Sequence, residues 1–197
     1  MEKTSESITA QRNKPVINRT MPSKKDITDI ADKIRNIPDF PKEGINFKDI
    51  TPLLSDIKIF RKAVKQMATP FMNSNIHIVV GIESRGFIFG APIADYLNCS
   101  FVPVRKPGKL PWKTENISYE LEYGKDTLEI HTDAIRKGQN ILIVDDLLAT
   151  GGTAEATCNL VSKLDGNIQG FTVLIELEFL NGRKKLNQYN VHSLVKY

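Results

Sequence analysis

Hydrophobic and polar positions along the chain form blocks that predict alternating strands and helices. Short runs rich in β-branched residues indicate buried strands, and apolar residues spaced three or four apart indicate helices. The expected strands are 76–82, 101–104, 128–130, 141–144 and 168–177, and the expected helices are 23–37, one from about 56, one after 84, one near 133 and one after 153. This order predicts an α/β fold, a single domain with a central, mainly parallel twisted sheet flanked by helices.

The N-terminal part of this pattern is the least regular. Ser23 and Asp26 have the spacing of a helix capping box, and isoleucines at 27, 30, 34 and 37 share one helical face that Pro38 ends. Pro41 and Gly44 predict a turn before the segment Phe-Lys-Asp-Ile at 47–50. Further on, Pro92 inside a helical pattern predicts a kink or a late helix start.

Residues 141–153, Ile-Leu-Ile-Val-Asp-Asp-Leu-Leu-Ala-Thr-Gly-Gly-Thr, combine a strand, two acids and a loop of small residues before a helix that Gly166 is placed to end. Glycines and free amides at a helix start suit a phosphate, and Thr150 and Thr153 add hydroxyl donors. Asp145 and Asp146 can accept hydrogen bonds from vicinal sugar hydroxyls or bind Mg²⁺ through oxygen or water. Together these features predict a site for ribose 5-phosphate. The alternative is an ordinary strand-to-helix turn with capping residues, which requires neither the paired acids nor the paired glycines.

Two further segments are expected at the same carboxyl edge of the sheet. Glu83-Ser84-Arg85-Gly86 follows one strand, and the basic loop 105–109 follows the next. They bring Arg85, Arg105, Lys106 and Lys109 near the phosphate loop. A single phosphate hardly needs so many cations, whereas pyrophosphate does. The alternative here is a solvated basic loop.

Residues 110–125 alternate in the manner of a hairpin. Tyr119, Leu121 and Tyr123 fall on one face, and Glu120 and Glu122 fall on the other.

Charge and composition narrow the choice of partners. Residues 1–25 hold six of the 27 basic and two of the 23 acidic residues, so the remainder holds 21 of each. The excess charge lies in a polar, aperiodic segment, and a disordered basic tail is expected at 1–22. The balanced remainder argues against nucleic acid as a partner. The sequence shows neither a run long enough to span a membrane nor a signal-peptide pattern, which predicts a cytoplasmic protein without membrane contact.

The positions of the cysteines and histidines indicate neither disulfide bonds nor a metal site. Cys99 and Cys158 stand alone, so a disulfide framework is not expected. His77, His131 and His192 lack metal-ligand spacing and are interpreted as structural or surface residues.

The order of these motifs resembles one family, the adenine phosphoribosyltransferases among the type I phosphoribosyltransferases. The resemblance runs from about Ile34 to the C-terminus and includes Ser-Arg-Gly-Phe at 84–87, Arg-Lys-Pro-Gly-Lys-Leu-Pro at 105–111, Leu-Glu-Tyr-Gly at 121–124 and the central motif. It implies a phosphoribosyltransferase domain over 23–197, with a mobile lid at about 107–125, and a homodimer.

The resemblance also implies a reaction: adenine and phosphoribosyl pyrophosphate give AMP and pyrophosphate. Mg²⁺ is expected to bind together with phosphoribosyl pyrophosphate, and no residue is assigned as its direct ligand. It implies catalytic roles for Glu122, Arg85 and Tyr123. The binding residues that it implies are Asp145, Asp146, Ala149, Thr150, Gly151, Gly152 and Thr153 for ribose 5-phosphate, Glu83, Ser84, Arg85, Arg105 and Lys109 for pyrophosphate, and Asn46, Phe47, Lys48 and Leu147 for adenine. A cis peptide bond between Glu83 and Ser84 is implied as well.

The chain departs from the family pattern at one position, and two other functions remain as alternatives. The family commonly has arginine where this chain has Lys48, and lysine lacks the planar fork. A type I transferase for hypoxanthine, guanine or orotate would keep the central motif but change the base pocket and lid. A non-enzymatic regulator that senses phosphoribosyl pyrophosphate and binds nucleic acid would use the basic tail, and it would not need the lid carboxylate.

Overall fold

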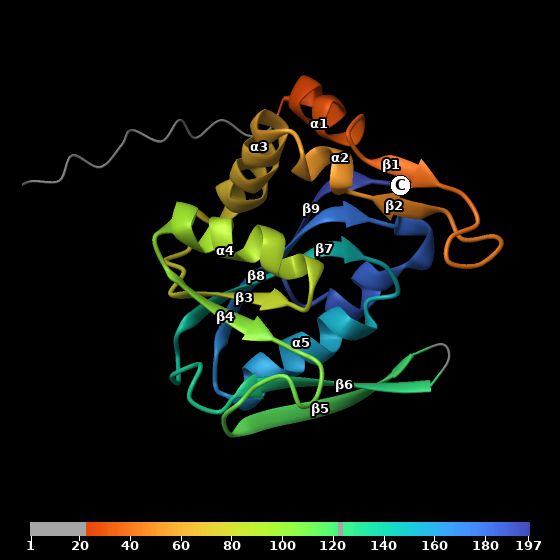
Figure 1. The fold of residues 1–197 in the computed structure, drawn as a ribbon. Coiled ribbons are helices and arrows are strands. Elements are labelled where there is room, and N and C mark those ends of the chain that lie inside the picture. The colour runs from red at the N-terminus through yellow and green to blue at the C-terminus, as the bar shows by residue number, and fades with distance from the viewer. Residues whose placement is uncertain (1–22, 122–123) are drawn as a thin grey trace, which may run out of the picture.

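A five-stranded parallel sheet forms the centre of the computed structural model, which describes residues 23–121 and 124–197 (Figure 1). The strand order is β4-β3-β7-β8-β9, and every neighbouring pair is parallel. The strands are β3 (Ile78–Ile82), β4 (Ser100–Val104), β7 (Asn140–Leu148), β8 (Asn167–Glu176) and β9 (Val191–Lys196). This confirms the predicted fold class.

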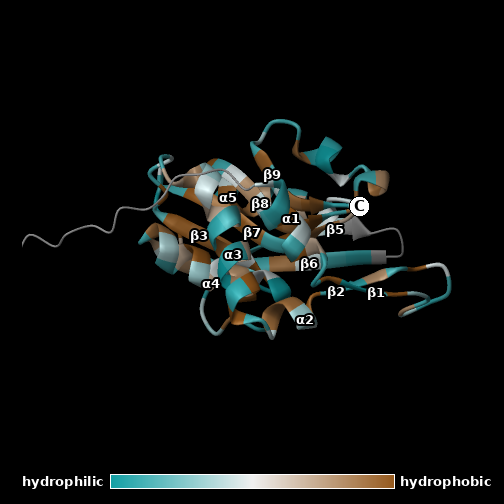
Figure 2. Ribbon diagram, turned by 90° about the horizontal axis from the view of Figure 1, so that it is seen from above, coloured by the Kyte–Doolittle hydropathy of each residue, from teal (hydrophilic) through white to brown (hydrophobic). Residues whose placement is uncertain are grey.

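Helices cover both faces of the sheet, because the strands alternate in the side chains that they present. Leu142 and Val144 of β7 join the core beneath α3 (Ile57–Ala68) and α4 (Arg85–Leu97). Ile141 and Ile143 of β7 join the core beneath α5 (Gly152–Lys163). The central strands are accordingly hydrophobic along most of their length (Figure 2).

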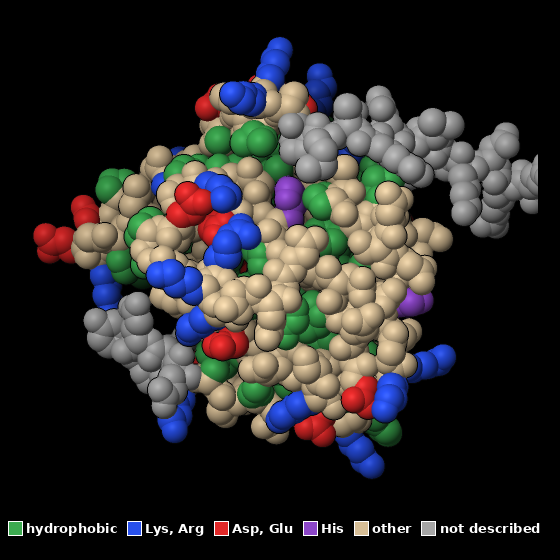
Figure 3. Space-filling model, turned by 180° about the vertical axis from the view of Figure 1, so that it is seen from behind, with side chains coloured by type: hydrophobic (Ala, Val, Ile, Leu, Met, Phe, Trp, Pro, Cys, Tyr) green, Lys and Arg blue, Asp and Glu red, His purple; other side chains and the backbone are tan. Residues whose placement is uncertain are grey.

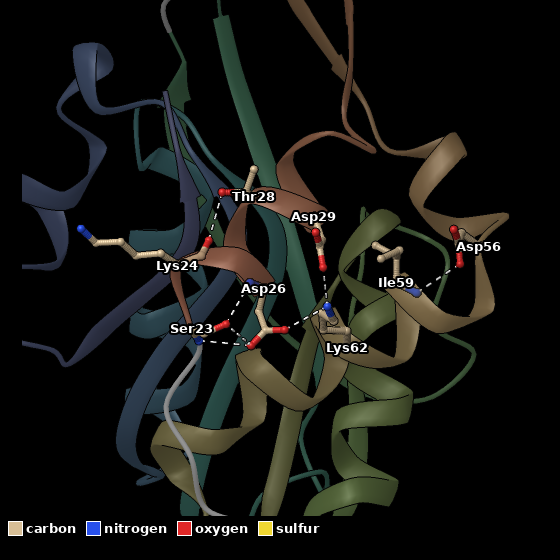
Figure 4. A network of polar contacts seen from close by, with 8 residues as sticks. All are labelled: Ser23, Lys24, Asp26, Thr28, Asp29, Asp56, Ile59 and Lys62. Carbon is tan, nitrogen blue, oxygen red and sulfur yellow. Dashed lines mark hydrogen bonds and ion pairs between the residues drawn. The ribbon is translucent and has the colours of Figure 1, made fainter.

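The N-terminal segment packs as a layer on α3. The capping box of Ser23 and Asp26 is present at the start of α1 (Lys24–Ala31). Lys62 of α3 contacts Asp26 at 2.9 Å and Asp29 at 2.7 Å, which ties the two helices together (Figure 4).

The predicted helix over 23–37 is wrong beyond Ala31. Residues Arg35–Ile37 form β1, which pairs antiparallel with β2 (Phe47–Asp49), and the Arg35–Asp49 ion pair at 2.6 Å supports that register. Strand pairing overrides the helical spacing of the isoleucines there. The predicted turn between these strands is present, with Gly44 at φ +83°. Two short helices follow, α2 (Thr51–Leu54) before α3 and η1 (Thr69–Phe71) after it.

The hairpin is longer than its sequence pattern indicates. β5 (Thr114–Leu121) pairs antiparallel with β6 (Gly124–His131), so the predicted strand 128–130 is the end of the second arm. The short helix expected near Asp133 is absent from this described part of the chain. Residues 132–134 form a turn, closed by a hydrogen bond from Ala134 N–H to the His131 carbonyl.

Three other boundaries differ from expectation. α4 begins at Arg85 and continues through Pro92, so the late start is wrong. α5 ends at Lys163, earlier than the predicted end at Gly166, and the left-handed residue after it is Asp165 (φ 57°). β9 was not expected, and it follows the short helices η2 (Glu178–Leu180) and η3 (Gly182–Leu186).

The surface charges, the cysteines and the helix lengths agree with the expectations from composition. Lys and Arg lie beside Asp and Glu on the rear face rather than in one large patch of a single sign (Figure 3). Cys99 and Cys158 are free cysteines. No helix in the described ranges is both long and apolar enough to cross a membrane. The predicted tail at 1–22 lies outside the described residues.

Candidate active site

A cavity of about 450 Å³ opens at the carboxyl ends of β3 and β7. Twelve of the residues predicted for the site line it. They are Phe47, Glu83, Ser84, Arg85, Asp145, Asp146, Leu147, Ala149, Thr150, Gly151, Gly152 and Thr153. The open sheet thus brings segments far apart in sequence to one edge, as the topology requires.

The loop that follows β7 builds the floor of this cavity. β7 does not end at Val144, as its pattern indicated, but continues through both aspartates to Leu148. The chain then turns at Gly151 (φ +80°), which is the N-cap of the 12-residue helix α5. The first amides of α5 lack carbonyl partners within the helix, and the residues at this helix start line the cavity, where the macrodipole favours an anion.

The two aspartates lie next to each other in an enclosed part of the site. Burial and the neighbouring Asp146 charge raise the pKa of Asp145 well above its usual value. Burial also raises the pKa of Asp146, although the guanidinium of Arg85 opposes this rise. The Arg85 Nε–Asp146 Oδ2 distance is 2.9 Å. Arg85 therefore supplies the counter-charge that a carboxylate at this position needs.

The Glu83 carboxylate organises the basic loop at the rim. Arg105 Nη2 lies 3.0 Å and Lys109 Nζ 3.4 Å from Glu83 Oε1, and the Lys106 backbone N–H donates to Glu83 Oε2 at 2.9 Å. Burial alone would raise the pKa of Glu83, but these hydrogen bonds lower it below its usual value. Arg105 and Lys109 do not line the cavity themselves, but both form ion pairs with Glu83, which does. The Glu83–Ser84 peptide bond is cis, which confirms that expectation.

The predicted adenine-binding residues separate into two groups. Phe47 lines the cavity, with the Arg85 guanidinium 5.2 Å from its ring centroid and Phe40 packed edge-on at 5.2 Å. Lys48 is buried outside the cavity, where its Nζ donates to Asn36 Oδ1 at 2.6 Å and lies 3.7 Å from the Tyr197 ring centroid. Asn46 is exposed and does not line the cavity either.

A tyrosine hydroxyl of the hairpin contacts the first turn of α5. Tyr119 Oη lies 3.1 Å from Thr153 Oγ1 and donates to Asp126 Oδ2 at 3.2 Å. Asp126 in turn contacts the Lys106 ammonium, and Lys106 lines the cavity. The predicted catalytic residues Glu122 and Tyr123 lie outside the described residues.

Residues 51–194 match the phosphoribosyl transferase domain family. The adenine phosphoribosyltransferase of Methanococcus vannielii is 55% identical over 169 residues, which cover 86% of this chain and 98% of the relative. That of Nitrosococcus oceani is 56% identical over 165 residues, covering 84% and 96%. The chain belongs to the adenine phosphoribosyltransferase family.

Solved structures of adenine phosphoribosyltransferases agree with this assignment. The enzyme from Thermoanaerobacter pseudethanolicus superimposes with a TM-score of 0.84 at 52% identity, covering 87% of this chain and 99% of that one. The Saccharomyces cerevisiae enzyme, solved with an imino-altritol bisphosphate and adenine, gives a TM-score of 0.82 at 41% identity, covering 86% and 98%. These values extend the likeness over nearly the whole described chain.

Several residues of this site could not be identified from the sequence. Leu128, Leu148 and Ala154 line the cavity as ordinary core residues with no distinguishing signal. The Tyr119–Asp126 pair could be found only from the correct hairpin register, which pairs these two residues directly. The described residues contain no cluster of three or more His, Cys, Asp or Glu side chains placed to hold a metal ion.

Proposed function

We propose that this protein transfers the 5-phosphoribosyl group from phosphoribosyl pyrophosphate to adenine, giving AMP and pyrophosphate. One observation carries the proposal. A single edge of the sheet presents a small-residue loop at a helix start, two carboxylates, an arginine and an aromatic ring around one cavity of about 450 Å³. These are, respectively, the partners that a phosphate, a ribose, a pyrophosphate and a purine base require.

The residues act mainly by binding and orientation. The amides and hydroxyls of 149–153 hold the 5-phosphate, and Asp145 and Asp146 accept hydrogen bonds from the ribose hydroxyls. Arg85, with Arg105 and Lys109 at the rim, binds the pyrophosphate. As the bond from ribose C1 to pyrophosphate breaks, charge builds on the leaving group, and fixed cations stabilise that charge more than they stabilise the bound donor.

The base is bound by Phe47, whose ring lies beside the Arg85 guanidinium in the same cavity. Phe47 stacks on adenine, the Asn46 backbone reads its exocyclic amine, and Leu147 packs against the ring. Lys48 contributes indirectly, because its bonds to Asn36 and Tyr197 hold β2 in place. Positioning the attacking nitrogen in line with C1 supplies much of the rate.

Magnesium fits this site as part of the donor complex. Mg²⁺ commonly retains several waters and binds through one or two carboxylates together with substrate phosphates. Asp145 and Asp146 offer those carboxylates. The described residues hold no group of three or more His, Cys, Asp or Glu side chains that would bind a metal ion without the substrate. When bound, the ion would neutralise charge on the pyrophosphate.

The hairpin is proposed to act as the lid over about 107–125. Closure excludes water, which would otherwise attack the same carbon and waste the donor. Glu122 would exchange a proton with the imidazole ring of adenine, and Tyr123 would pack over the closed site. Free cysteines fit a reducing cytoplasm, and the resemblance to the family suggests a homodimer.

The assay for this proposal supplies phosphoribosyl pyrophosphate and Mg²⁺ with adenine, hypoxanthine, guanine or orotate in parallel and identifies the nucleotide formed. AMP from adenine, with at least about 100-fold lower kcat/KM for the other bases, is the expected result. A preference for another base would move the protein to that transferase. Donor binding without nucleotide formation would favour the regulator.

A further inference from the structure

The phosphate loop rests on a glycine from the C-terminal segment. Gly182, at the start of η3, is buried, and η3 packs beside α5 (Figure 1). A Cβ added to Gly182 would overlap the Ala149 carbonyl oxygen and lie 2.8 Å from the Gly151 nitrogen. Conversely, a Cβ on Gly151 would lie 2.5 Å from the Gly182 carbonyl oxygen. The two backbones are therefore as close as glycine alone permits.

The neighbouring Arg183 fixes where Gly182 lies. Its Nε donates to Glu176 Oε1 at 2.8 Å, its Nη1 to the Val191 carbonyl at 2.8 Å and its Nη2 to Ser193 Oγ at 2.8 Å. Glu176 is only 3% exposed and pairs with Leu148, the last residue of β7 before the loop. One guanidinium thus joins the last residue of β8 and the first half of β9 to the segment beneath the loop.

We propose that Gly182 and Arg183 are positioning residues for the 5-phosphate: Gly182 sets the height of the loop 149–151, and Arg183 holds Gly182 in register with the sheet. This inference rests on the proposed function, in which that loop binds the 5-phosphate. Neither residue touches the substrate, and neither lines the cavity. Their effect is to hold the loop amides where the phosphate oxygens lie.

The test uses the full chain and the two halves of the donor as separate probes. In Gly182→Ala the added methyl must push the loop away, and a displacement of about 1 Å can cost on the order of 100-fold in a positioned site. Ribose 5-phosphate should bind about 10- to 100-fold more weakly than to wild type. Binding of Mg²⁺-pyrophosphate, and the KM for adenine, should change by less than about twofold.

Two further variants keep the test decisive. Arg183→Lys retains the charge but loses the fork, so it should weaken ribose 5-phosphate binding in the same direction by a smaller factor. Lys184→Ala, an exposed neighbour on the same segment, is the control and should leave binding unchanged. If Gly182→Ala does not fold, Arg183→Lys alone decides, judged by the same ratio of ribose 5-phosphate to pyrophosphate affinity.

The outcomes separate this inference from the function beneath it. If the wild type itself fails to bind ribose 5-phosphate, the assignment of the loop is wrong. If the wild type binds it and both variants bind it equally well, the positioning role alone is overturned. Equal losses for both halves of the donor would also overturn the role, because they would indicate a general structural defect.

Discussion

In the proposed function, Arg85 is the side chain on which charge balance and donor binding both depend. Its Nε pairs with Asp146 at 2.9 Å, which leaves the four N–H groups of its Nη atoms available for phosphate oxygens. Replacing it by methionine removes both functions while keeping a flexible, unbranched apolar stem. Replacing it by lysine keeps the charge and removes the planar fork.

The size of the effect follows from the exposure of the two partners. Removing one partner from a fully buried pair costs about 3–5 kcal/mol in free energy of unfolding. The Asp146 side chain is 6% exposed but that of Arg85 is 33% exposed, and solvent screening reduces the expected loss to about 1–2 kcal/mol. Two lost hydrogen bonds to pyrophosphate, about 1.5 kcal/mol each, lower kcat/KM for the donor about 100-fold in Arg85→Met. Arg85→Lys should lose about tenfold.

The pH dependence gives this prediction a direction. The Arg85 charge opposes the rise in the pKa of Asp146, so its removal raises that pKa further. Because ionised Asp146 holds the ribose in the proposed function, kcat/KM of Arg85→Met should begin to fall at a higher pH than that of wild type as the pH is lowered, and it should recover as the pH rises.

Steady-state kinetics across the pH range and urea unfolding measure both effects. Arg61→Met, at an exposed position on α3, is the matched control and should match wild type in both assays. A kcat/KM for Arg85→Met within about twofold of wild type would refute the reasoning, because the cation would then have no part in donor binding. A loss of kcat/KM that is the same at every pH would refute the coupling between Arg85 and the pKa of Asp146.

Four other changes test separate parts of the account. Glu122→Gln should cut turnover about 10²–10⁴-fold with donor affinity nearly unchanged, whereas Glu120→Gln should do little, and equal kinetics for the two would deny Glu122 a special role. Tyr119→Phe removes the hydroxyl that bridges the hairpin to the phosphate loop, and it should speed amide hydrogen exchange in β5 severalfold; unchanged exchange would mean that the contact does not hold the lid. The hydrogen bond from Arg183 lowers the pKa of Glu176, so Glu176→Gln should lose about 1–2 kcal/mol of unfolding free energy at neutral pH, and the deficit in urea titrations should shrink as the pH falls through that lowered pKa. Deletion of residues 1–22 should leave turnover within about twofold and reduce weak, salt-sensitive binding to polyanions, whereas loss of turnover would show that the tail supports the core.

The features that sequence alone could predict are those encoded in contiguous residues. The apolar run Ile141–Val144, mostly β-branched, predicts a buried strand, and the acids and glycines after it predict a phosphate site without any knowledge of distant contacts. Because parallel strands end at one edge, strand order alone was enough to bring Arg85 into the same cavity.

The features that escaped prediction depend on tertiary contacts. Ile34 and Ile37 have helical spacing, yet pairing with β2 makes Arg35–Ile37 a strand. The hairpin register that joins Tyr119 to Asp126 depends on which residues form the turn, and alternation alone does not fix it. Gly182 lies about thirty residues beyond the loop it supports, and only the folded structure shows the close approach.

The most direct test of the central claim is a crystal structure of the protein with AMP and Mg²⁺-pyrophosphate. We expect the 5-phosphate within hydrogen-bond distance of the amides of 150–153, both ribose hydroxyls on Asp145 and Asp146, and adenine stacked on Phe47. A 5-phosphate bound instead by the basic loop at 105–109, or a base away from Phe47, would contradict the assignment of this site.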